Sequence, residues 1–248
     1  LDSALLYYRK AMLITDSVDK GSSVDYLTSM ASIFISMGDF KQADESLTSG
    51  IRLAREISDS LSLVNSLQFS SFLYSRTAEF DRGLKNNDSA IAIFQQSGHQ
   101  IRLASTYTSR ATLFNSMGEN KLAIQANLYA DSLYQEEMQT MQRGILNNNI
   151  GIIYMSQGDY LTGLKYLQKA VAVLPKGVVN EDYLLTQGNV AECYIGLKKF
   201  KEARTLLQQC LPLAQKMKLN RIASGMALVS GKLSMQEDKS ADAIEFYK

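Results

Sequence analysis

Few residues of this 248-residue sequence have the types and spacing that catalysis or metal binding requires. The nearest match to a phosphate-binding loop is Gly225–Lys232, GMALVSGK, but its glycines are one residue too far apart and Leu233 replaces the required hydroxyl. The single histidine, His99, falls in a predicted turn, where a lone imidazole is usually solvated. The motifs GxSxG, HExxH and CxxC do not occur. We therefore expect no catalytic residue, no metal site and no cofactor, and an enzyme is the weakest of the functions considered.

The two cysteines, Cys193 and Cys210, are predicted to be separate free thiols. On paired antiparallel helices they would be offset along the helix axis by about six residues, which is roughly 9 Å at 1.5 Å per residue. A disulfide does not span such an offset comfortably.

Charge and hydropathy argue against two classes of partner. With 26 Lys and Arg against 25 Asp and Glu, the net charge is +1, which disfavours nucleic acid and anionic membranes as direct partners. No apolar run approaches the ~18 residues of a membrane span, and no signal-peptide pattern opens the chain.

The elements that position any binding residues are organised by a period of about 40 residues. Aromatic residues stand nine and three positions before many of the recurring small residues, as Phe34 and Phe40 do before Ala43. A fixed period in this range is typical of a stacked solenoid, in which small residues let helices approach closely. With only two prolines the helices should be largely uninterrupted, because an interior proline costs about 3 kcal/mol. The recurring small residues are Ala4, Ala43, Gly83, Ala123, Gly163, Ala203 and Ala243.

Residues 144–175 resemble one tetratricopeptide repeat. They read GILNNNIGIIYMSQGDYLTGLKYLQKAVAVLP, in which Ile150-Gly151, Tyr154 and the closing Pro175 match the pattern of the family. The period of 40 rather than 34 is similar to the long-repeat branch of that family, and this copy resembles the repeat-bearing sensor regions of bacterial histidine kinases and helix-turn-helix regulators. The resemblance implies an all-α fold, a right-handed superhelix of antiparallel helix pairs.

We expect the whole chain, 1–248, to be a single array from a longer protein, with about six repeats after a leading half-repeat. The predicted repeats are 1–23 (the half-repeat), 24–60, 61–100, 101–140, 141–180, 181–219 and 220–248. The predicted helices are 2–18, then the pairs 24–37/40–57, 61–77/80–96, 101–117/120–137, 141–157/160–174, 181–197/200–216 and 220–236/239–248. Copies two, five and six lack the glycine expected at the turn within the pair.

The resemblance also implies that the first helix of each pair lines a concave groove. The groove columns lie fifteen, fourteen, eleven and eight residues before each small residue. In the first five copies they hold mainly amides and hydroxyls and no Lys or Arg, so the grip on a C-terminal carboxylate used by some family members has no counterpart. The candidate groove residues are Gln68, Phe69, Phe72, Thr108, Thr112, Asn115, Asn148, Asn149, Ile152, Asn189 and Glu192.

Asn148-Asn149 and the residues after them, NNIGIIY, resemble the N-N-L-A-x-L-Y run of the long-repeat branch, and Asn189 carries half of it. Such amides can hold an extended peptide by its backbone, since a primary amide both donates and accepts. Phe69 and Phe72 would supply an apolar anchor. The competing interpretation is a solvated polar face, but few solvated helix faces carry so little charge.

The sequence thus favours a non-catalytic scaffold that binds a protein or an extended peptide, as the signal-input or partner-docking module of a bacterial signalling or regulatory protein. The alternative is a structural module that self-assembles through its repeat ends, because incomplete repeats would expose apolar helix faces. No direct contact with nucleic acid or membrane is expected. The segment would be periplasmic in a membrane histidine kinase and cytoplasmic otherwise.

Overall fold

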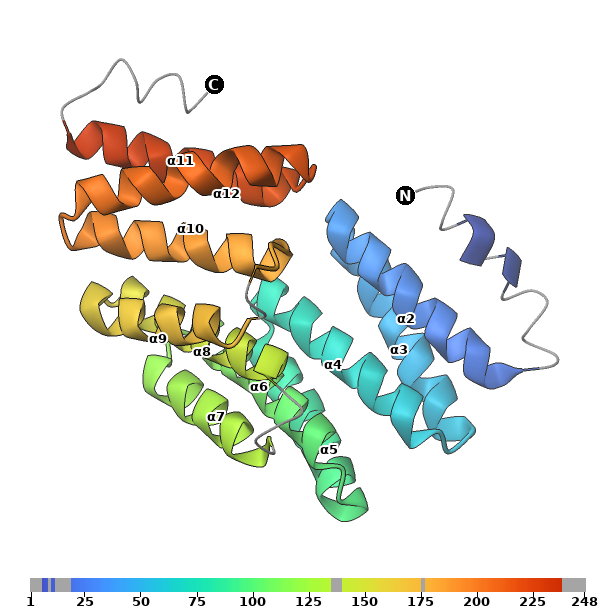
Figure 1. The fold of residues 1–248 in the computed structure, drawn as a ribbon. Coiled ribbons are helices and arrows are strands. Elements are labelled where there is room, and N and C mark those ends of the chain that lie inside the picture. Colours follow the sequence, from blue (N-terminus) through green and yellow to red (C-terminus); the bar gives the residue numbers. More distant parts are fainter. Residues whose placement is uncertain (1–5, 9, 12–18, 135–139, 175–176, 238–248) are drawn as a thin grey trace. The chain divides into compact units, whose positions relative to one another are not determined.

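The computed structural model describes residues 6–8, 10–11, 19–134, 140–174 and 177–237, and within these ranges all regular structure is helical (Figure 1). The predicted helices between residues 20 and 236 are present, with bounds within four residues of those expected. The predicted helix at 239–248 and most of the one at 2–18 lie outside the described residues, as do Ala4 and Ala243.

The chain divides into two compact units, Leu1–Tyr134 and Gln135–Lys248. The first contains α2 (Lys20–Met37), α3 (Phe40–Glu56), α4 (Ser60–Thr77), α5 (Phe80–Ser97), α6 (Gln100–Ser116) and α7 (Asn120–Leu133). The second contains α8 (Thr140–Ser156), α9 (Tyr160–Ala172), α10 (Glu181–Gly196), α11 (Phe200–Lys216) and α12 (Asn220–Gln236).

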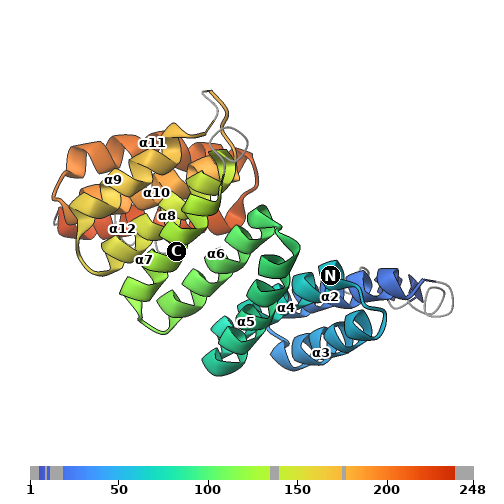
Figure 2. The ribbon, with the colours of Figure 1, turned by 90° about the horizontal axis from the view of Figure 1, so that it is seen from below.

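Each unit is a stack of helix pairs, as the sequence predicts. Consecutive helices pack against each other, for example α2 with α3 and α4 with α5 (Figure 2). First helices of neighbouring pairs also touch: α2 contacts α4 and α4 contacts α6, and in the second unit α10 contacts both α8 and α12. The first helices of each unit therefore form a continuous layer. The repeat bounds given for the whole chain remain a prediction.

Aspartates cap several helices at their first residues. The Asp39 carboxylate accepts a hydrogen bond from the backbone N–H of Gln42 at 3.1 Å, and Asp159 accepts one from Thr162 at 3.0 Å. These bonds satisfy amide groups that have no acceptor within the helix. The bond from the Thr162 N–H also lowers the pKa of Asp159, because it favours the charged carboxylate.

Nine described residues have the left-handed conformation; Gly177, between α9 and α10, is one, and the other eight lie in turns and recur with a spacing of 20 residues or a multiple of it. After each residue at this spacing except Gly98, the N–H of the next residue donates to the carbonyl five positions before it, as Glu79 does to Tyr74 at 3.0 Å. Ala78 and Lys198 supply this conformation where copies two and five lack glycine, although it costs a non-glycine residue about 1–2 kcal/mol. The eight recurring residues are Gly38, Ser58, Ala78, Gly98, Gly118, Gly158, Lys198 and Lys218.

The recurring small residues lie where the helices meet. Ala43, Ala123 and Ala203 are fully buried. A Cβ added to Gly163 would lie only 3.0 Å from the carbonyl oxygen of Gly151, so the backbones of α8 and α9 approach closely at this pair. At the five described positions, Ala43, Gly83, Ala123, Gly163 and Ala203, the prediction that the small residues mark the places where helix hairpins nest is confirmed.

Two identical substitutions in the second unit should have opposite effects on stability. Gly158 has a φ of +81° and Gly225 lies inside α12, and no atom lies within 4 Å of a Cβ added at either position. We expect Gly158→Ala to lower the free energy of unfolding by about 1 kcal/mol, because alanine resists the left-handed conformation. Gly225→Ala should raise it by about 1 kcal/mol through helix propensity. Urea unfolding followed by circular dichroism measures both, and a stabilised Gly158→Ala protein would contradict this account of the turns.

Candidate binding surface

The described part of the chain gathers no group of three or more His, Cys, Asp or Glu that could hold a metal ion. Gly225–Lys232 lies entirely within α12, so this segment is a helix and not a phosphate-binding loop. His99 is exposed just before α6, with its ring centroid 6.5 Å from that of Phe94. Among the described helices none combines the length and hydrophobicity of a membrane span.

Both cysteines are buried free thiols, as predicted. Burial, and secondarily the charge of Glu192, raises the pKa of Cys193 to about 12. Burial also raises the pKa of Cys210. Both side chains therefore stay protonated at neutral pH and act as small apolar residues in the core.

On α4 the predicted groove residues divide into two exposed aromatics and one amide held by a neighbour. Phe69 is 39% exposed and Phe72 is 45% exposed, and their spacing of three places them one turn apart on the same face. The Gln68 side chain is half-buried, and its Nε2 donates to the Thr106 hydroxyl of α6 at 3.0 Å. The structure thus leaves the phenylalanines open to a ligand but uses Gln68 to join two first helices.

Two of the predicted groove residues on α6 form side-chain hydrogen bonds within their own helix. The hydroxyls of Thr108 and Thr112 donate to the carbonyls of Ala104 and Thr108, four residues earlier, at 3.1 and 3.2 Å. Thr112 and Asn115 are exposed, and Thr108 is half-buried. Among these three residues, the hydrogen-bonding capacity that remains open is mainly that of Asn115.

In the second unit the structure brings two of the predicted asparagines together. The Asn189 Nδ2 on α10 donates to the Asn148 Oδ1 on α8 at 3.0 Å. Asn148 is only 8% exposed, whereas Asn149, Ile152 and Asn189 are half-buried. The amides therefore form a connected pair between adjacent first helices and are not a row of independent solvated groups.

A charged residue that the sequence reasoning missed extends this surface. The Lys232 Nζ on α12 donates to the Glu192 carboxylate on α10 at 2.5 Å. Lys232 occupies the groove column eleven residues before Ala243, in the sixth copy, and the columns were followed through only five copies. Lys232 lies one period of 40 residues after Glu192, so the repeat spacing alone predicts its place in the column.

A cavity of about 210 Å³ opens among α8, α9 and α10 next to the paired asparagines. Asn148 and Asn149 line it together with Asp182 and Thr186, which no groove column had marked. The remaining wall is mostly apolar and includes Met141, Ile145, Leu174 and Leu185.

A larger cavity, of about 740 Å³, lies among α9, α10 and α11. Its lining mixes apolar residues such as Val171, Tyr194 and Leu206 with the charged Lys201 and Glu202. None of the predicted groove residues lines it, so it belongs to a different face of α10 from Asn189.

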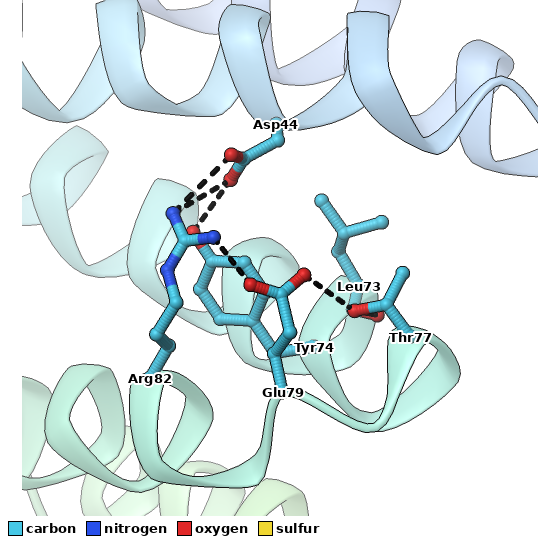
Figure 3. Close-up of polar contacts among 6 residues, drawn as sticks. All are labelled: Asp44, Leu73, Tyr74, Thr77, Glu79 and Arg82. Atoms are coloured by element: carbon cyan, nitrogen blue, oxygen red, sulfur yellow. Dashed lines mark hydrogen bonds and ion pairs between the residues drawn. The ribbon is translucent and has the colours of Figure 1, made fainter.

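Charged side chains of the first unit join neighbouring repeats (Figure 3). The Arg82 guanidinium on α5 donates to both carboxylate oxygens of Asp44 on α3 at 3.2 Å and to Glu79 at 2.6 Å. It also lies 4.1 Å from the centroid of the Tyr74 ring, and the Tyr74 hydroxyl donates to Asp44 at 2.5 Å. Burial and the bond to Asp44 raise the pKa of Tyr74. This network tethers α3, α4 and α5 to one another.

Two segments of the chain match sequence models described as the tetratricopeptide repeat, residues 24–57 and residues 142–216. Among curated proteins, none matches this sequence.

Several solved structures have a similar fold. BtubC (BKLC) from P. vanneervenii is 19% identical, with a TM-score of 0.68 over 88% of this chain and 89% of that one. NprR in complex with its cognate peptide NprX is 16% identical, with a TM-score of 0.69 over 96% of this chain and 68% of that one. A signal transduction ATPase with a tetratricopeptide repeat sensor from Pyrococcus horikoshii is 14% identical, with a TM-score of 0.74 over 96% of this chain but only 36% of that one. At these identities the likeness establishes the fold.

The buried thiols give a direct test of the packing in the second unit. We expect Cys193 and Cys210 to react negligibly with a thiol reagent such as 5,5′-dithiobis(2-nitrobenzoate) at pH 8 in the folded protein, because they are protonated and inaccessible. Both should react completely in urea. A Ser36→Cys variant, with its cysteine at an exposed position on α2, serves as a reactive control. Rapid labelling of the folded wild-type protein would contradict the burial of these side chains.

Proposed function

We propose that this chain, a tetratricopeptide repeat protein, is a non-catalytic scaffold whose layers of first helices bind an extended peptide or a segment of a partner protein. The observation that carries the proposal is the joined pair Asn148–Asn189, which lies on adjacent first helices and borders the small cavity among α8, α9 and α10. The asparagine pair and Asn149 beside it offer uncharged hydrogen-bond donors and acceptors, which suit the backbone of a peptide.

The contact between the two asparagines favours binding because it fixes their orientation in advance. An asparagine held by a neighbour loses less conformational freedom when a ligand arrives than a fully solvated one. Asn149 has no hydrogen bond from its side chain to another described residue, so both of its polar atoms are open to a peptide N–H and C=O. In this proposal the Asn148–Asn189 hydrogen bond provides the framework, and Asn149 together with the remaining Nδ2 of Asn148 contacts the ligand backbone.

In the first unit, Phe69 and Phe72 are proposed to anchor an apolar side chain of a ligand. Large aromatic side chains exposed by 39% and 45% on one helical face bury much surface when covered, which is the usual character of an energetic hot spot. Thr112 and Asn115 on α6 would supply polar contacts, and in the second unit Ile152 would add an apolar contact and Glu192, paired with Lys232, a charged one.

We further propose that the chain serves as a signal-input or partner-docking module of a bacterial signalling or regulatory protein. Its support is the similarity in fold to NprR, whose structure holds the peptide NprX, and to a signal transduction ATPase that carries a repeat sensor. Flanking residues of the same gene test this role directly, since an effector domain there would be expected.

Self-association is a second candidate function, favoured by the exposed apolar residues of α12. Leu228 is 51% exposed and Met235 is 59% exposed, both on the first helix of the last copy. Light scattering over a range of concentrations distinguishes the two functions, because a constant monomer mass would exclude assembly through this helix.

Alanine substitutions should separate binding from stability at the two neighbouring asparagines. With peptides selected from a random library on the full chain, we expect Asn149→Ala to weaken binding by about tenfold without changing the melting temperature, since it breaks no bond within the protein. Asn148→Ala should weaken binding and also lower the free energy of unfolding by about 1 kcal/mol, because it leaves the Asn189 amide without its acceptor.

The matched control is Asn86→Ala, which removes a half-buried asparagine from α5, the second helix of its pair. It should leave peptide affinity unchanged in the same fluorescence-polarisation titration. If Asn149→Ala binds every selected peptide as tightly as the wild type does, the proposed amide contact is wrong.

A further inference from the structure

We propose that the cavity of about 210 Å³ among α8, α9 and α10 binds a primary ammonium group that is attached to a small apolar residue, as at the free amino terminus of a peptide. This inference rests on the peptide-binding function proposed above and names the end of the ligand that the second unit would receive.

The cavity wall presents an acceptor and a donor that no described residue satisfies. The Asp182 carboxylate is half-buried in the first turn of α10 and forms no ion pair or side-chain hydrogen bond within the described ranges. Asn148 is 8% exposed, and its Oδ1 is occupied by Asn189, which leaves its own Nδ2 without an acceptor among the described residues. Neither group is among the described buried atoms that lack a partner, so water can reach both, and a ligand that bonds to both would replace that water. The missing partner is therefore a cationic donor next to a neutral acceptor.

The negative charge at the cavity comes from Asp182 and not from the preceding Glu181. Glu181 precedes it on α10 and is also acidic, but its carboxylate is already paired with Arg221 of α12 at 3.4 Å. Glu181 does not line the cavity, whereas Asp182 does. The open negative charge in this turn consequently faces the cavity, where an ammonium ion would form a charge-assisted hydrogen bond.

The size of the cavity and its apolar wall restrict the group that carries the ammonium. A volume of about 210 Å³ is below the roughly 300–1,000 Å³ of sites for drug-sized ligands, so it accommodates about one residue. Ile145, Leu174 and Leu185 provide the apolar contact. An amino-terminal residue combines ammonium, carbonyl oxygen and side chain within one residue. A lysine carries its charge at the end of a four-carbon stem, away from its carbonyl.

The test uses the full chain and two pairs of ligands in isothermal titration calorimetry. L-leucinamide carries the ammonium, the carbonyl and a branched side chain, and in N-acetyl-L-leucinamide a larger neutral amide replaces the ammonium. The second pair is a peptide with a free amino-terminal leucine and the same peptide acetylated at that end, with one internal lysine in both. We expect the unacetylated member of each pair to bind at least tenfold more tightly.

Two variants connect the effect to the cavity. Asp182→Asn removes the charge at nearly constant size and should abolish the preference for the unacetylated ligands. Glu181→Gln makes the same change in net charge one residue away and outside the cavity, and should bind like the wild type. Melting temperatures equal to that of the wild-type protein establish that both variants are folded.

Three results would overturn this inference alone. Equal affinity for free and acetylated ligands, or unaltered discrimination in Asp182→Asn, would show that the cavity does not recognise the ammonium group. Tight binding of the acetylated peptide that depends on both its lysine and Asp182 would assign the cavity to a side-chain ammonium. In each of these cases the scaffold function still holds if library peptides bind the chain and Asn149→Ala weakens that binding. If no peptide binds the chain at all, both proposals are overturned.

Discussion

Close packing of neighbouring helices at the recurring small residues is the constraint on which both units depend. In the second unit a Cβ on Gly163 would lie 3.0 Å from the Gly151 carbonyl oxygen, and in the first unit a Cβ on Gly83 would lie 2.7 Å from the Leu113 side chain. Helices this near are held by many short van der Waals contacts, and even one added methyl group must displace a neighbour. Polar links such as Arg82–Asp44 join helices that this packing has already placed, and partly exposed ion pairs of that kind add only about 0–1 kcal/mol each.

The same packing decides which part of each first helix is left for a ligand. Because each residue advances about 100° around a helix, turning Gly151 toward α9 directs Asn149 and Ile152 to other sides. The contact between α8 and α10 then covers most of Asn148, whose position in the column suggested an open side chain. Polar side chains between neighbouring first helices pair at close range, as amides and hydroxyls do at Asn148–Asn189 and Gln68–Thr106 and as an ion pair does at Glu192–Lys232.

Features that depend on local sequence were predictable, and features that require several helices to converge were not. Helix bounds follow from caps such as Asp39 and from periodicity, so they were recovered closely. The turn at Ala78 was uncertain because nothing in its local sequence reveals a left-handed alanine, although the spacing from Gly38 and Gly118 does. Asp182 escaped notice because the cavity it lines is formed by the ends of three helices, and no column of the repeat marks that place.

The left-handed turn residues also make the chain modular in a way that bears on how it could have evolved. Their positions keep all described copies in the same phase, with 20 residues from one turn to the next in most of the chain. Unequal crossing-over between two copies at equivalent turns removes or adds a whole helix hairpin and leaves every other hairpin in register. A single-codon insertion inside a helix instead rotates all that follows by about 100° relative to its capping turn. Lineages of this protein should therefore differ in length by whole hairpins far more readily than by single residues within them.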